Sequence, residues 1–344
     1  MKSIKGKLSY RCYDGVPMPD MDLLKAQLAN GEFKTLSEES IIDTIFGWVN
    51  PKQPFLPIAD SDIIDWKVGS YLVFAYRIDQ VKYDKAKFDI MLAKAVKESG
   101  YTHVSTDMKR EMADKIKREL RKKNQPRTKI VEAFYDMVTK KLVVLSKSTT
   151  DSMYIEKLWE VSFGIQAAAK LCFKEYITEF LLGEQPAIGF GQLGPKQFLM
   201  SVYSECNAND LNWATEGHVG LLISDDSIKL SGLVEGQGGN MGNTYTVKSC
   251  AGVNEDAVVN QLIEHNAAAI DELKFTMTAG QLDIDFCVKE DSLVPYGIDL
   301  PPTPFDGDDK IEHRFDILLL VDEVWRQIIT RFRHIKTEKA EDNF

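Results

Sequence analysis

The sequence has few cysteines and histidines, and neither residue type is grouped. The five cysteines are widely spaced, odd in number and free of any CxxC pair: Cys12, Cys172, Cys206, Cys250 and Cys287. A disulfide framework needs paired cysteines, and a zinc site needs closely spaced ligands. The five histidines are equally dispersed: His103, His218, His265, His313 and His334. The sequence therefore predicts reduced thiols, as is typical of the cytoplasm, and no metal or other cofactor.

Long hydrophobic runs are also missing. Apolar runs such as Ile317–Val321 fall far short of the roughly 20 residues that cross a bilayer. No early basic-then-apolar leader is present, so we expect neither secretion nor a membrane span. With 344 residues, of which 44% are hydrophobic and 27% charged, the composition suits a soluble globular protein of two or three domains.

Signatures of common enzymes are absent or incomplete. The sequence has no GxSxG elbow, catalytic Cys/His signature or HExxH helix. Gly189–Gly194 has the GxGxxG spacing of dinucleotide-binding loops, but no β-rich run precedes it and Pro195 stands where the helix would begin. Gly236–Gly242 lacks the Lys-Ser/Thr of a phosphate-binding loop. We interpret both segments as loops.

Acidic residues cluster in the C-terminal third, at Asp271, Glu272, Asp283, Asp285, Glu290, Asp291 and Asp306–Asp309. A two-metal nuclease would need several such carboxylates to converge. The alternation in Leu282–Phe286 instead favours a half-buried strand whose acids face water. Both interpretations remain open, and the strand is the stronger.

Charge is distributed unevenly along the chain. The net charge of −10 opposes nucleic-acid binding on its own, because like charges repel. Residues 109–129, however, carry ten basic and three acidic residues, a net charge of +7 that leaves −17 for the rest. The basic residues are Lys109, Arg110, Lys115, Lys117, Arg118, Arg121, Lys122, Lys123, Arg127 and Lys129. Such a cluster can neutralise phosphates, or it can be only a solvated helix face.

Periodicity predicts a mixture of strands and helices along the chain. The expected strands are Ile4–Tyr10, Val68–Ile78, a hairpin over Ile130–Leu145, Leu273–Met277 and Leu282–Val288. The expected helices are Asp20–Ala29, a helix that starts at Ser37–Ser40 and ends at Phe46–Pro51, Asp84–Glu98, Asp107–Lys123, Asp151–Ala169 and Asp322–Lys336. Leu300–Asp309 is an expected loop.

Several sequence landmarks, in a fixed order from Ile4 to about Phe332, resemble the RdgC family of recombination-associated proteins. They are Tyr10-Arg11, Gly47-Trp48-Val49 with Pro51, Tyr71–Arg77, Ile177–Leu181, Asp283–Leu293, and Arg314-Phe315-Asp316 followed by Leu318–Leu320. In the spacing of a further family motif, Leu120, Lys123 and Arg127 fall on its first leucine, internal arginine and last arginine.

This resemblance implies an architecture. It implies an α+β, horseshoe-shaped protomer that pairs into a closed two-fold ring. Residues 1–81 and 129–172 would form a central domain, 82–128 a helical basic tip and 173–344 a base. Residues 213–247 would be a longer hairpin than in the family, and Arg314–Asp316 would lie in a strand before the terminal helix.

The same resemblance implies a function. The protein would be a non-catalytic, nucleoid-associated homodimer that binds double-stranded DNA without sequence preference and restrains a RecA-type recombinase. The basic residues named above would contact DNA together with Lys248, which lies where the family has a second basic cluster. Two alternatives remain: a metal-dependent DNA exonuclease, and a protein-interaction module that has lost DNA binding.

Overall fold

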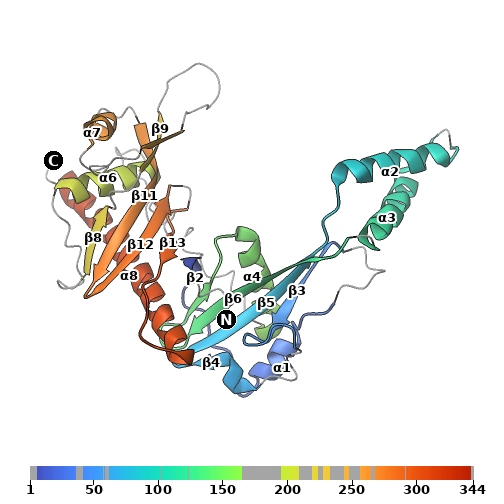
Figure 1. Ribbon diagram of the computed structural model, residues 1–344, viewed down its shortest axis with the longest axis horizontal. Helices are drawn as coiled ribbons and strands as arrows, with labels where there is room; N and C mark the ends of the chain where they lie inside the picture. The colour runs from blue at the N-terminus through green and yellow to red at the C-terminus, as the bar shows by residue number, and fades with distance from the viewer. Residues whose placement is uncertain are drawn as a thin grey trace.

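The computed structural model of the protein describes residues 6–35, 42–56, 58, 62–101, 103–122, 124–164, 195–208, 219–223, 228–232, 244–247, 256–264, 268–290 and 292–341. Within these residues the chain forms two antiparallel sheets and seven α-helices (Figure 1). The predicted α+β class is therefore confirmed.

The six-stranded sheet has the order β2-β7-β6-β5-β3, with β4 paired to β5. Its strands are β2 (Arg11–Tyr13), β3 (Thr44–Val49), β4 (Lys67–Val68), β5 (Tyr71–Gln80), β6 (Arg127–Asp136) and β7 (Lys141–Val144). The central pair, β5 and β6, runs in register from Tyr71 opposite Asp136 to Gln80 opposite Arg127. Most of β5 is buried, because both faces of this sheet are covered.

One face of the six-stranded sheet is covered by α1 (Leu24–Ala29) and α4 (Thr149–Phe163). A short 3-10 helix, η2 (Ile63–Trp66), adds Trp66 to the same core. The buried rings of Trp48, Phe74 and Trp159 meet there, with the Trp48 and Phe74 centroids 5.7 Å apart. The indole Nε1 of Trp48 donates a hydrogen bond of 2.7 Å to Ser162 Oγ, which fixes α4 on the sheet.

The seven-stranded sheet has the order β1-β13-β12-β11-β9-β10, with β8 also paired to β11. Its strands are β1 (Lys7–Ser9), β8 (Val219–Ile223), β9 (Ile228–Gly232), β10 (Thr244–Val247), β11 (Ala268–Ala279), β12 (Leu282–Lys289) and β13 (Tyr296–Asp299). The helices α6 (Pro195–Ala208) and α7 (Ala257–Glu264) pack against it.

The longest helix, α8 (Gly307–Glu341), joins the cores of the two sheets. The ring of Phe315 stacks on Phe134 of the six-stranded sheet, with centroids 3.9 Å apart. Further along α8, the ring of Trp325 packs against Phe275 of the seven-stranded sheet, with ring centroids 5.5 Å apart. A single hydrophobic core therefore includes residues of both sheets and α8.

A buried charge cluster adds polar contacts to this junction. The Asp322 carboxylate is fully buried and accepts hydrogen bonds from Tyr10 Oη at 3.0 Å and Lys141 Nζ at 3.1 Å. Arg326 Nε donates to the same carboxylate at 2.9 Å, and its Nη1 lies 2.7 Å from Asp14. The buried carboxylate is thus paired with cations, as its burial requires.

The helices α2 (Lys85–Glu98) and α3 (Thr106–Lys122) lie between β5 and β6 in the chain and pack side by side. We call residues 85–122 the helical arm. Figure 1 shows the helical arm projecting from the end of the six-stranded sheet, on the side opposite the seven-stranded sheet. Both helices lie within one or two residues of their predicted bounds.

The predicted helix ending at Phe46–Pro51 is wrong, because Thr44–Val49 is strand β3. Its β-branched and aromatic side chains pair with β5, with Trp48 opposite Tyr76. Gly47 does not end a helix. A Cβ at that position would lie 2.4 Å from Phe33 Cα, so the glycine permits a close backbone approach instead.

The predicted strand at Arg314–Asp316 is also wrong, since α8 already begins at Gly307. Its acidic residues Asp308 and Asp309 lie in the first turn, where negative charge stabilises a helix. In the described part of the expected strand Ile4–Tyr10, the strand is β1 (Lys7–Ser9), and the helix expected from Asp20 begins at Leu24. β1 and β2 are consecutive in the chain but lie in different sheets. The domain boundaries stay predictions.

Candidate nucleic-acid interface

An N-terminal cap on α2 and a few buried apolar side chains of α3 stabilise the helical arm. Asp84 caps α2 by accepting hydrogen bonds from the backbone N–H groups of Ala86 and Lys87. Ile116 and Leu120 of α3 are buried, whereas none of the residues of α2 is buried. The arm therefore presents most of its surface to solvent.

The structure places the predicted DNA-binding residues in different settings. Seven of them are exposed, namely Lys109, Arg110, Lys115, Arg118, Lys122, Arg127 and Lys129, and Lys117 is half-buried. Lys123 and Lys248 lie outside the described residues. Arg121 and Lys129 already have carboxylate partners.

Three of the exposed cations form a row on α3. Lys115, Arg118 and Lys122 are spaced three and four residues apart, so they lie on one side of the helix. Seven residues of α-helix extend for about 10 Å. A DNA duplex carries one charge per roughly 1.7 Å of its axis, so the row is long enough to meet several phosphates. We call these three residues the arm row.

Arg121 is buried and does not belong to this exposed surface, so it is a weaker candidate for a DNA contact than the arm row, and its role stays a prediction. Its side chain is 6% exposed, and its Nη2 lies 3.2 Å from Asp43 Oδ1. Tyr83 Oη donates to the other oxygen of the same carboxylate at 3.3 Å. Burial, together with Asp43, raises the pKa of Tyr83. Arg121 therefore ties the base of the helical arm to the segment that precedes β3.

Lys129 is partly committed as well. Its Nζ lies 2.5 Å from the buried Asp151 carboxylate near the start of α4. Ser146 Oγ also donates to that carboxylate. Lys129 is consequently a weaker candidate for phosphate binding than the arm row.

The sequence interpretation missed four exposed lysines of α2: Lys85, Lys87, Lys94 and Lys97. Lys94 makes an i,i+4 pair with Glu98 at 3.7 Å. The lysine content of this helix could have indicated them in the sequence. It bears on DNA binding because α2 packs beside the basic helix α3. Residues 82–129 carry fifteen basic and seven acidic residues, a net charge of +8.

The predicted half-buried strand with alternating acidic residues is confirmed as β12. Along β12, buried Ile284, Phe286 and Val288 alternate with more exposed residues. Asp283 and Asp285 accept hydrogen bonds from threonines of β11 at 2.8 and 2.7 Å. In the part of the chain that the structure describes, no three His, Cys, Asp or Glu side chains gather in a geometry that could hold a metal ion.

The other sequence candidates are two glycine-rich segments and the cysteines. Both glycine-rich segments, Gly189–Gly194 and Gly236–Gly242, lie outside the described residues. Cys12 and Cys287 are free thiols, and burial raises the pKa of both. Among the described residues, no helix has the length and apolar character needed to span a bilayer.

No protein-family model matches the chain, and no curated protein matches it. The resemblance to RdgC proteins therefore depends on the sequence landmarks alone and stays a hypothesis.

Proposed function

We propose that the protein binds double-stranded DNA, without sequence preference, through the helical arm. The observation that carries this proposal is the arm row, three exposed cations on one side of a helix that projects from the body of the protein. Lysine and arginine side chains on such a surface contact phosphates, and phosphates carry no direct sequence information.

The separation of charge supports the proposal. The helical arm carries eleven basic and six acidic residues, a net charge of +5, in a chain whose total is −10. The rest of the chain therefore repels DNA, and the helical arm is the part that attracts it. Such a distribution favours one mode of approach over indiscriminate binding, and it makes affinity strongly dependent on salt.

The resemblance to RdgC proteins extends the proposal to assembly and role. We propose that two horseshoe-shaped protomers form a homodimeric ring with the basic helical arms facing its opening. DNA would pass through that opening, and its occupancy would restrain a RecA-type recombinase. This role requires neither turnover nor a cofactor.

The test replaces the arm row by glutamate, as Lys115→Glu, Arg118→Glu and Lys122→Glu together. The matched control replaces three exposed lysines outside the arm by glutamate, as Lys67→Glu, Lys157→Glu and Lys310→Glu together. Fluorescence anisotropy measures binding to two labelled duplexes of about 30 base pairs and unrelated sequence. Losing several phosphate contacts should weaken the arm variant by about 100-fold or more near 50 mM salt. The control should lose at most a few-fold.

Equal affinity of the two triple variants would overturn the assignment of the arm. A second triple variant with glutamine at the same three positions, checked by circular dichroism, separates loss of charge from loss of fold. Cleavage of the duplex with Mg²⁺ would favour the exonuclease alternative. A homodimer that binds neither duplex would favour a protein-interaction module.

A further inference from the structure

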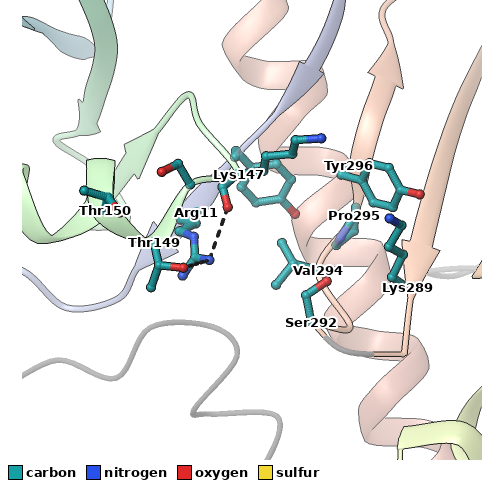
Figure 2. Close-up of a pocket in the computed structure, with 11 residues that line it drawn as sticks. Arg11, Lys147, Thr149, Thr150, Lys289, Ser292, Val294, Pro295 and Tyr296 are labelled. Atoms are coloured by element: carbon teal, nitrogen blue, oxygen red, sulfur yellow. Dashed lines mark hydrogen bonds between the residues drawn. The ribbon is translucent and has the colours of Figure 1, made fainter. Parts of the chain in front are cut away.

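A second basic surface lies far from the helical arm, in a cavity of about 560 Å³ between the two sheets (Figure 2). Three segments line this cavity: the start of β2, the loop into α4, and the β12–β13 connection. The lining residues are Tyr10, Arg11, Lys147, Ser148, Thr149, Thr150, Lys289, Ser292, Val294, Pro295 and Tyr296. We call it the junction pocket.

The charge of the junction pocket has one sign. Arg11, Lys147 and Lys289 line it from three different segments, and none of the described lining residues is acidic. In a chain with ten more acidic than basic residues, a pocket of this composition strongly favours an anion. The 15-residue helix α4 begins at the same wall, where its dipole adds partial positive charge.

Arg11 is held in position at this wall. Its Nη2 donates to the backbone oxygen of Lys147 at 3.2 Å and to Thr149 Oγ1 at 3.3 Å. Figure 2 shows these bonds directing the guanidinium toward the first turn of α4. A cation fixed in this way loses little side-chain entropy when it binds a ligand.

The other two cations are less constrained. Lys147 makes no ion pair with any described residue. Lys289 Nζ lies 3.6 Å from Glu272, whose carboxylate it shares with Lys229 at 2.8 Å. The Lys289 side chain remains 45% exposed, so it can turn toward an anion. Together the three cations can surround a multiply charged group.

The wall formed by the β12–β13 connection also contains apolar and aromatic side chains. Val294 and Pro295 are buried, and the ring of Tyr296 lies beside Lys289, 5.4 Å from its Nζ. A volume of about 560 Å³ falls within the range of small-molecule sites. Cations from three segments and the ring of Tyr296, which lies beside one of them, match a phosphate joined to a planar organic group.

We propose that the junction pocket binds the phosphate group of a nucleotide-sized ligand. The site is separate from the arm row and is not used by the proposed mode of duplex binding. The phosphate could belong to a free nucleotide or to a short stretch of nucleic-acid backbone. Arg11 holds the phosphate next to the first turn of α4, Lys147 and Lys289 reach it from the rest of the lining, and Tyr296 contacts the planar part.

Isothermal titration calorimetry of the full chain tests this proposal with three probes: pyrophosphate, ADP and 5′-phosphorylated dithymidine. The variant Lys147→Gln with Lys289→Gln removes two charges and leaves Arg11 and its backbone contact in place. Lys157→Gln is the matched control, because Lys157 is exposed on α4 outside the pocket. The glutamine variant of the arm row is titrated in parallel.

At least one probe should bind the wild type and the Lys157→Gln control equally, and the double variant should bind it at least tenfold more weakly. ADP binding would identify a free nucleotide as the source, and binding of dithymidine alone would identify nucleic-acid backbone. The arm-row variant should retain this binding even if it loses duplex DNA. Failure of all three probes, or equal affinity of the double variant and the control, would overturn the proposal.

Discussion

The guanidinium of Arg121 and the carboxylate of Asp43 lie 3.2 Å apart at the base of the helical arm. Arg121 Nε and Nη1 are buried and find no hydrogen-bond partner among the described residues. The arginine thus depends on Asp43 for its charge compensation. Since Asp43 also accepts from Tyr83, one carboxylate connects the start of α2 and the end of α3 to β3.

Removing this charge should loosen the arm. Asp43→Asn leaves Arg121 buried without a counter-charge and should lower the free energy of unfolding by about 1–3 kcal/mol. Urea unfolding measures the loss, and hydrogen exchange should show faster exchange near residues 81–85 and 118–126. Asp89→Asn, at an exposed site on α2, is the control. Identical exchange in the two variants would contradict the anchoring role.

The salt dependence of DNA binding gives a second prediction. If Arg118 neutralises a phosphate, Arg118→Gln should reduce the slope of log affinity against log salt by about 0.9. Lys310→Gln, which is exposed on α8, should leave the slope unchanged. Anisotropy titrations between about 50 and 200 mM salt measure both slopes. A lower affinity with an unchanged slope would mean that Arg118 acts through structure and not through phosphate.

The effect on stability of a glycine beside the N-terminal part of α8 can be compared with that of a second glycine that also has a positive φ. Gly69 has φ +53°, and a Cβ there would lie 1.8 Å from Glu312 Oε1, which accepts from Ser70 N at 3.1 Å. Gly100 has φ +69° and open space around it. Both alanine variants incur strain, but only Gly69→Ala displaces Glu312. Thermal and urea unfolding should show an additional loss of about 1 kcal/mol at Gly69.

Equal losses in the Gly69 and Gly100 variants would show that the Glu312 contact contributes nothing to stability.

The ion pairs of Glu272 predict a pH dependence. Burial acts to raise the pKa of Glu272, but hydrogen bonds from Lys229 and Tyr296 and the charges of Lys229 and Lys289 outweigh it, so the pKa is lowered. A lowered folded-state pKa gives stability that is present above the ordinary value of 4.5 and lost as pH falls through the folded value. Glu272→Gln should therefore destabilise the protein near neutral pH, and this difference should shrink in acid.

Urea unfolding of the wild type and of Glu272→Gln between neutral and acid pH measures the difference in their free energies of unfolding. A gap that stays constant from about pH 7 to about pH 3 would contradict a role for the ionised carboxylate, because protonation of Glu272 in acid removes the charge that its ion pairs require.

The regular parts of the fold were predictable from sequence, and the helical arm is the best example. Its two helices have strong start signals and a four-residue apolar spacing at Met108, Met112, Ile116 and Leu120. β3 was not predictable in the same way, because Gly47 and Pro51 look like helix-ending residues unless the partner strand β5 is known. Tertiary pairing decided that segment, not local propensity.

The same limit applies to the candidate sites. The excess of positive charge in 109–129 is visible in the sequence, but the burial of Arg121 depends on Asp43, 78 residues away. The junction pocket combines Arg11, Lys147 and Lys289, which are isolated cations in sequence. No local pattern marks them, because the chain brings them together only when the two sheets meet.

The pairing of β1 with β13 also sets an order of events during synthesis. Lys7 lies opposite Asp299, so among the described strands β1 has no partner until residue 299 has been made. At about 5–20 residues per second, roughly 15–60 s separate the synthesis of these two strands. The six-stranded sheet, whose last strand ends at Val144, can form during that interval. Strand β1 is therefore placed after the strands of the six-stranded sheet, although it precedes them in the chain.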